Sequence, residues 1–194
     1  MNPPIIERAT CCCVAGHRPG RLPSGWKREP AACSPVRSAL RRAVVQAAQE
    51  GYRTFLSGMA LGVDTWAAEE VLALRDEGWP VRLVAALPCP GQDSRWSPGD
   101  RRTYRDLLRL ADAVYTVSPA YAPYCMGARN RWMIERASRL IAVYDGGPGG
   151  TADTVRLAEK RGLSIVKIDP LHPEGSPPVS EPHDTFGAFL RFSK

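Results

Sequence analysis

Residues 140–168, LIAVYDGGPGGTADTVRLAEKRGLSIVKI, contain two apolar runs separated by a glycine-rich loop and a helical segment. The runs Leu140–Tyr144 and Ser164–Ile168 are nearly continuous in hydrophobicity, which is typical of strands buried on both faces of a parallel sheet. The segment from Thr151 to Gly162 is predicted as a helix that ends at a glycine. This stretch therefore predicts a strand–helix–strand unit with parallel strands.

The same alternation runs back to the N-terminus. Four further apolar runs are predicted as strands, namely Thr10–Ala15, Thr54–Ser57, Val81–Leu87 and Ala113–Val117. The predicted helices between them begin at Ser34 and Pro35 and end at Gly51, span Val63–Glu77, begin near Ser97 and Pro98, and span Met126–Ala137. The expected fold class is α/β, a Rossmann-like, doubly wound, mostly parallel sheet with helices on both faces.

The chain of 194 residues is long enough for one domain with a sizeable core. We expect a single Rossmann-like domain over residues 1–170. The following LHPEGSPPVSEPHD is rich in proline and polar residues, which predicts a surface tail over residues 171–194. The last residues, TFGAFLRFSK, are candidates for a short element that packs back.

Composition favours a cytoplasmic protein without membrane contact. No apolar run approaches the ~20 residues of a membrane span, and MNPPIIERAT lacks the pattern of a secretion signal. Six cysteines without a CxxC pair and three scattered histidines favour reduced, mostly buried thiols, and no metal site is expected. The net charge of +6 leaves nucleic acid open as a partner. Arg37 and Arg41 share a helix face that is either phosphate-facing or simply solvated.

The unusual segments follow five of the predicted strands. In chain order they are GHRPGRLPSGW, GMALGVDTW, PCPGQDSRW, SPAYAPYCMGARN and DGGPGGTADT. Ligands bind beyond the carboxyl ends of the strands in an open α/β sheet, so these loops predict a common crevice. The ligand-binding residues predicted from them are Gly16, His17, Arg18, Ser57, Gly58, Gly62, Asp64, Arg129, Asn130, Gly147, Gly149, Gly150 and Thr151.

These residues have different expected roles. The glycine loops Gly58–Gly62 and Gly147–Thr151 are expected to hold phosphate through backbone N–H groups and helix dipoles. Arg129, with Arg18, is expected to neutralise the phosphate, and an ordinary surface ion pair is the alternative for Arg129. Asp64 and Asn130 are expected to contact ribose or base, and a helix-start role is equally open for Asp64. No catalytic residue is assigned.

The segment from Gly147 to Ala152 matches the dinucleotide fingerprint G-x-G-x-x-G/A, and Asp169 lies 20 residues past Gly149. That fingerprint normally opens a fold with several units still to come, whereas only one predicted strand follows here. The position therefore favours a phosphate-binding loop over a dehydrogenase site.

Taken together, the motifs resemble the YpsA-like family of the SLOG superfamily of Rossmann-like proteins. They are GHRP, FLSGMALGVDTWAAE, LPCPGQDSRW, CMGARNRWM and AVYDGGPGGTADTVRLAEKRG, which occur in this order between about Cys11 and Asp169. The resemblance implies a nucleotide or nucleotide-derived ligand at the strand C-termini and a homodimer.

Two further branches are similar. The lonely-guy phosphoribohydrolases use an arginine in M-x-x-R, matched by Met126 and Arg129, and a glutamate in P-G-G-x-G-T-x-x-E, where this chain has Thr154. DNA-processing protein A, which binds single-stranded DNA, has S-G-x-A-x-G-I-D, similar to Ser57–Asp64.

The sequence thus predicts a sensor or binding module for a nucleotide-derived small molecule of the ADP-ribose, NAD or nucleoside monophosphate type. No cofactor is expected to be required beyond such a bound nucleotide. Cleavage of the base from a nucleoside monophosphate and binding of single-stranded DNA remain the alternatives, and enzymatic activity stays open.

Overall fold

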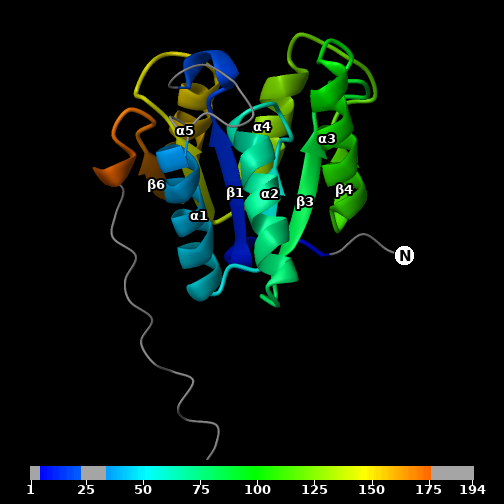
Figure 1. The fold of residues 1–194 in the computed structure, drawn as a ribbon. Coiled ribbons are helices and arrows are strands. Elements are labelled where there is room, and N and C mark those ends of the chain that lie inside the picture. Colours follow the sequence, from blue (N-terminus) through cyan, green and yellow to red (C-terminus); the bar gives the residue numbers. More distant parts are fainter. Residues whose placement is uncertain (1–4, 23–33, 176–194) are drawn as a thin grey trace, which may run out of the picture.

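The computed structural model describes residues 5–22 and 34–175, and these form one sheet covered by helices (Figure 1). The strands are β1 (Cys11–Gly16), β2 (Thr54–Ser57), β3 (Arg82–Leu87), β4 (Ala113–Thr116), β5 (Arg139–Val143) and β6 (Ser164–Ile168). The α-helices are α1 (Ser34–Gln49), α2 (Val63–Asp76), α3 (Pro98–Leu110), α4 (Cys125–Arg136) and α5 (Gly150–Lys160). Each predicted strand and helix is present, with ends shifted by at most two residues, which is the usual uncertainty of element ends.

All strand pairs are parallel, in the order β4-β3-β2-β1-β5-β6. The predicted Rossmann-like α/β fold is confirmed, and the sheet is fully rather than mostly parallel. The order turns at β1, which pairs with β2 on one side and with β5 on the other. The loops after β1 and β5 therefore lead to helices on opposite faces, and such a switch point opens a crevice at the carboxyl ends of the strands.

Two hydrophobic cores lie on the two faces of the sheet. Helices α1, α2 and α3 pack on one face, and α4 and α5 pack on the other, as Figure 1 shows with α1 and α2 in front. The CCC run of β1 serves both cores, because Cys12 faces the first while Cys11 and Cys13 face the second. Burial raises the pKa of the Cys11 thiol to about 12. The prediction of buried, free thiols is confirmed for the five cysteines of the described residues.

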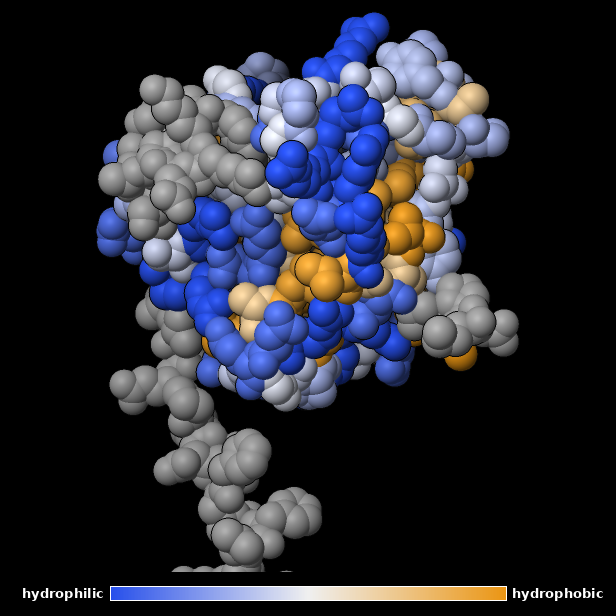
Figure 2. Space-filling model, turned by 45° about the vertical axis from the view of Figure 1, so that its right-hand side comes forward, coloured by the Kyte–Doolittle hydropathy of each residue, from blue (hydrophilic) through white to orange (hydrophobic). Residues whose placement is uncertain are grey.

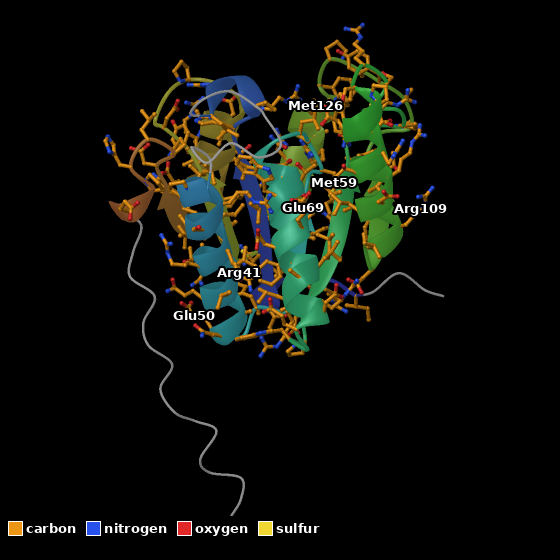
Figure 3. All side chains as sticks on the ribbon, viewed as in Figure 1. Arg41, Glu50, Met59, Glu69, Arg109 and Met126 are labelled. Carbon is orange, nitrogen blue, oxygen red and sulfur yellow. The ribbon has the colours of Figure 1, made fainter. Side chains whose placement is uncertain are left out.

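Arg37 and Arg41 of α1 are not a free phosphate-facing patch. Arg37 pairs with Glu69 and Glu70 of α2. Arg41 pairs with Glu70 and with Glu77, the residue that follows α2. Figure 3 shows Arg41 and Glu69 on these two adjacent helices. The two arginines therefore hold α1 against α2, and their charge is largely neutralised by the facing acids.

Little of the predicted tail falls within the described residues. Pro173–Gly175 forms a short 3-10 turn that contacts α1. Residues 176–194, including the predicted terminal element, lie outside the described part of the chain. Within residues 5–22 and 34–175, no helix has both the length and the apolar character of a membrane span.

Candidate functional site

A cavity of about 290 Å³ lies at the switch point, where the loops after β1, β2 and β5 meet the first turn of α4. We call it the strand-end pocket. The predicted site residues that line it are Gly16, His17, Arg18, Asp64, Arg129, Asn130, Gly149, Gly150 and Thr151. The structure thus brings together residues from four separate predicted loops in one space, and their role in binding stays a prediction.

Arg129 is the most buried cation of this pocket, with 5% of its surface exposed. Its Nη1 donates to the carbonyls of Gly58 and Ala86 and lies 3.8 Å from the Asp64 carboxylate, and its Nε donates to Asn130 Oδ1 at 2.8 Å. The Nη2 group has no hydrogen-bond partner among the described residues. The alternative of an ordinary surface ion pair is therefore wrong, since Arg129 is held inside the protein with one donor group left over.

Asp64 is the buried counter-charge of Arg129. It lies in the first turn of α2, where its Oδ2 accepts the Ala60 N–H at 3.3 Å. Burial raises the pKa of the Asp64 carboxyl, against the lowering effect of the Arg129 charge. Burial likewise lowers the pKa of Arg129, against the effect of Asp64. Asp64 therefore has a hydrogen bond at the start of α2 and also borders the pocket. Its position is compatible with both expected roles, the helix start and the contact with ribose or base.

A chain of hydrogen bonds connects Arg129 to the start of α5. Asn130 accepts from Arg129 Nε and donates from Nδ2 to Thr154 Oγ1 at 2.9 Å, and Thr154 donates to the Gly150 carbonyl at 2.8 Å. Thr154 is buried, and its hydroxyl both accepts and donates within this chain. Its proton is therefore engaged, and it has no carboxylate to offer at the position where the lonely-guy motif has its glutamate.

The N-terminus of α5 faces the pocket without a side-chain cap. Its N-cap residue Gly149 has φ of +139°, and no side chain of residues 5–22 or 34–175 is recorded as accepting from the first-turn N–H groups. Gly150 and Thr151, the first two helical residues, both line the pocket. An uncapped helix start combines free N–H donors with the positive end of the helix dipole, which is the arrangement that binds phosphate.

Four predicted residues, Ser57, Gly58, Gly62 and Gly147, do not line the pocket. The Ser57 hydroxyl donates to the Asp64 carbonyl and accepts the Met59 N–H. Gly58 makes room for Arg129, Gly62 has φ of +103°, and Gly147 donates its N–H to Asp145. The Met59 and Ala60 N–H groups of the first glycine loop already have acceptors, whereas Gly149, Gly150 and Thr151 of the second line the pocket. The phosphate contact of either loop stays a prediction.

Residues that the sequence reasoning missed connect two of the loops. Asp145 lies 2.9 Å from His17 Nε2 and 3.1 Å from Arg21 Nη2, and Arg21 Nη1 donates to the Pro148 carbonyl at 2.6 Å. Arg21 belongs to the quoted GHRPGR segment, and Asp145 follows β5 almost directly, so their position after a strand was the available signal. This cluster fastens the glycine loop after β5 to the loop after β1.

Asp145 gives the cluster a pH dependence. The hydrogen bond from the Gly147 N–H is the largest cause that holds the pKa of Asp145 below its usual range, and the neighbouring Arg21 guanidinium adds to it. A lowered folded-state pKa stabilises the fold above the unfolded value of about 3.9, and this stabilisation is lost as the pH falls. We expect Asp145→Asn to give a shallower fall of Tm between pH 5 and pH 3 than the unaltered protein. A curve as steep as that of the unaltered protein, or of an Asp106→Asn control, would contradict this role.

Three tryptophans near the strand ends could in principle stack on a base, but none of them lines the pocket. Trp66 is buried in the core, Trp96 packs edge-on against Tyr104, and Trp132 packs against Tyr115, so these rings do not line the pocket. In the part of the chain that the structure describes, no three His, Cys, Asp or Glu side chains are grouped to hold a metal ion.

Comparisons with known proteins agree with this architecture. A model of the YspA SLOG family matches residues 12–163. UPF0398 protein BH1768 of Halalkalibacterium halodurans is 29% identical over 129 residues, which cover 65% of this chain and 68% of that protein. A UPF0398 protein of Bacillus thuringiensis is 29% identical over 152 residues, which cover 77% of this chain and 82% of that one.

Two solved structures are similar in fold. DNA processing protein A from Streptococcus pneumoniae superposes with a TM-score of 0.56 and 19% identity, over 84% of this chain and 50% of that one. The protein of the same name from Helicobacter pylori gives a TM-score of 0.55 and 19% identity, over 84% of this chain and 66% of that one. This chain thus spans half of the first protein and about two thirds of the second, and the likeness is one of fold.

Proposed function

This chain belongs to the YspA SLOG family, and we propose that its strand-end pocket binds a phosphorylated, nucleotide-derived small molecule as a sensor or binding module. The observation that carries the proposal is the buried Arg129 guanidinium in the same pocket as the start of α5, where neither Arg129 Nη2 nor the helix start has a side-chain partner among the described residues. A guanidinium and a row of backbone N–H groups are complementary to a phosphate. Arg18 and Arg21, which are exposed and line the same pocket, add positive charge.

Ribose and base are assigned to the other polar groups of the pocket. Asp64 Oδ2 and the Asn130 amide are the acceptor and donor groups expected to meet hydroxyls of a sugar or the edge of a base. Binding without hydrolysis is proposed, because the Thr154 hydroxyl is engaged in both directions. Asp153, the neighbouring acid, pairs with Arg156 and does not line the strand-end pocket.

Single-stranded DNA is the second candidate ligand. The H. pylori DNA processing protein A is described by its single-stranded DNA binding mode, and the fold resembles that of this chain. The arginines of α3 give this candidate little support, because three of them are already paired with acids. Arg101 and Arg105 share Asp93, and Arg109 pairs with Asp106. Figure 2 shows this side of the molecule, where hydrophilic residues lie beside an apolar area.

The proposal is tested by thermal shift with AMP, ADP-ribose and NAD. Binding at about 100 times the dissociation constant adds about 2.7 kcal/mol to the free energy of unfolding and raises Tm. We expect Arg18→Ala to weaken binding by about tenfold, since it removes a charge-assisted contact. Arg42→Ala, which removes an exposed arginine of α1, is the matched control and should bind as the unaltered protein does.

The outcomes separate the candidates. If no nucleotide raises Tm at millimolar concentration, the small-molecule proposal is wrong. If a single-stranded oligonucleotide binds with a steep salt dependence and the nucleotides do not bind, the DNA candidate replaces it. The homodimer implied by the family resemblance is part of the proposal and is checked by light scattering with and without ligand.

A further inference from the structure

A second hollow lies between α4 and α5, beside the strand-end pocket. We call it the α4–α5 groove, and its volume is about 580 Å³. Four residues border both spaces: Met126, Asn130, Gly150 and Thr154. Met126 lies at the upper end of α4 in Figure 3, where the strands point. Gly150 is the first residue of α5, so a phosphate at this helix start would lie on the boundary of pocket and groove.

The groove has a different chemistry from the pocket. Pro123, Tyr124, Ala128 and Leu157 give it an apolar lining, Arg131 is its exposed cation, and Asp153, which pairs with Arg156, is its acid. Tyr124 is 70% exposed, although covering a tyrosine ring is energetically favourable. Tyr124 is therefore an exposed aromatic ring of the groove on which a nucleotide base can stack.

Two glycines of the groove point to close approach of a ligand. A Cβ added to Gly127 or to Gly150 would have no other atom within 4 Å, so packing does not require a glycine at either place. Neither residue has a positive φ. Gly127 lies inside α4, where alanine stabilises a helix by up to about 1 kcal/mol over glycine. Its bare backbone leaves the floor of the groove open.

We propose that the α4–α5 groove is a second subsite, which takes the second nucleoside of a ligand whose phosphate lies at the start of α5. This inference rests on the proposed function. The first nucleoside occupies the strand-end pocket, whose volume of about 290 Å³ is small for a site that buries more than one such unit. The phosphate bridges the boundary at Gly150, and the second base stacks on Tyr124. The ligand class is therefore a dinucleotide, joined by either a pyrophosphate or a phosphodiester.

The test compares ligands that share one nucleoside. Dissociation constants are measured by calorimetry for AMP, for NAD as the pyrophosphate-linked probe, and for a 5′-phosphorylated deoxyadenosine dinucleotide as the phosphodiester-linked probe. We expect at least one dinucleotide to bind about tenfold more tightly than AMP, the size of one base–aromatic stack. Whichever dinucleotide shows the gain identifies the linkage.

Two variants assign the gain to the groove. Tyr124→Ala should remove the tenfold advantage of the dinucleotide and leave AMP affinity unchanged. Gly127→Ala should weaken the dinucleotide but raise the Tm of the free protein by about 1–4 °C, so loss of folding cannot explain the loss of binding. Tyr121→Ala is the matched control, since Tyr121 is 73% exposed just before α4 but does not line the groove.

Three results would overturn the subsite. The first is an equal affinity for AMP and both dinucleotides, and the second is an advantage that survives in Tyr124→Ala and Gly127→Ala. In both cases AMP still binds, so the proposed function stands alone. The third is a dimer that Tyr124→Ala or Gly127→Ala dissociates, because the groove is then covered by a second copy of the chain. If neither AMP nor a dinucleotide binds, both proposals are wrong.

Discussion

Arg129→Ala is expected to abolish nucleotide binding and to lower the free energy of unfolding by about 3–5 kcal/mol, the usual cost of removing one partner from a buried ion pair. The guanidinium is 5% exposed and its Nη1 lies 3.8 Å from the Asp64 carboxylate. Its loss leaves that carboxylate buried and also leaves the Gly58 carbonyl without this donor. Urea denaturation measures the stability, and thermal shift with the best ligand measures the binding.

The loss of stability should depend on pH. Burial already raises the folded-state pKa of Asp64, so its charge costs stability as the pH rises from about 3.9 toward that raised value. Without Arg129 the cost grows, and the deficit of Arg129→Ala should be larger at pH 7.5 than at pH 5. Adding Asp64→Asn should recover part of it. A deficit below about 1 kcal/mol at pH 7.5, comparable to that of Arg42→Ala, would show that the pair is not structural.

Gly58→Ala is expected to weaken nucleotide binding nearly as much as Arg129→Ala, although it replaces no functional side chain. A Cβ at this position would overlap Nη1 and Cζ of Arg129 and come within 2.7 Å of Asp64 Oδ2. The added methyl therefore displaces the guanidinium from its place, at a cost of about 1–3 kcal/mol that is typical of overpacking. The backbone is not the cause, because Gly58 does not have a positive φ.

A double-mutant cycle separates this mechanism from general damage. If the methyl acts through Arg129, Gly58→Ala should cost much less in the Arg129→Ala background, with a coupling energy of about 0.5–3 kcal/mol. Gly20→Ala is the control, since a Cβ there has nothing within 4 Å. Additive effects of the two substitutions would disprove steric displacement of Arg129.

The fold was accessible from the sequence because each strand carries its own signal. The run at 140–144 is apolar on both faces, as is typical of a parallel strand covered by helices, and it forms the buried strand β5. The run at 164–168 forms the edge strand β6, which is exposed at Ser164 and Lys167. The candidate site could be predicted in part, because the carboxyl ends of parallel strands lie at one edge of the sheet. Arg129 was placed correctly on the first turns of a helix, but its burial was not evident.

That burial depends on partners distant in sequence. Arg129 is enclosed by Gly58, which is 71 residues away in the sequence, and by Asp64, which is 65 residues away. Local sequence patterns do not predict contacts between residues so far apart. The Arg21–Asp145 pair was missed for the same reason, since its members are 124 residues apart. Charged residues in loops look alike in a sequence until the fold decides which of them meet.

The hydrogen-bond chain from Arg129 through Asn130 and Thr154 to Gly150 has a consequence for protein engineering. Thr154→Glu, the obvious route to a hydrolase, would place a carboxylate where a hydroxyl now joins two helices. The new side chain would lose the bond to the Gly150 carbonyl and set two acceptor oxygens against it. A catalytic glutamate and the hydrogen bond between α4 and α5 therefore require the same position. A hydrolase design would need a new contact between these two helices.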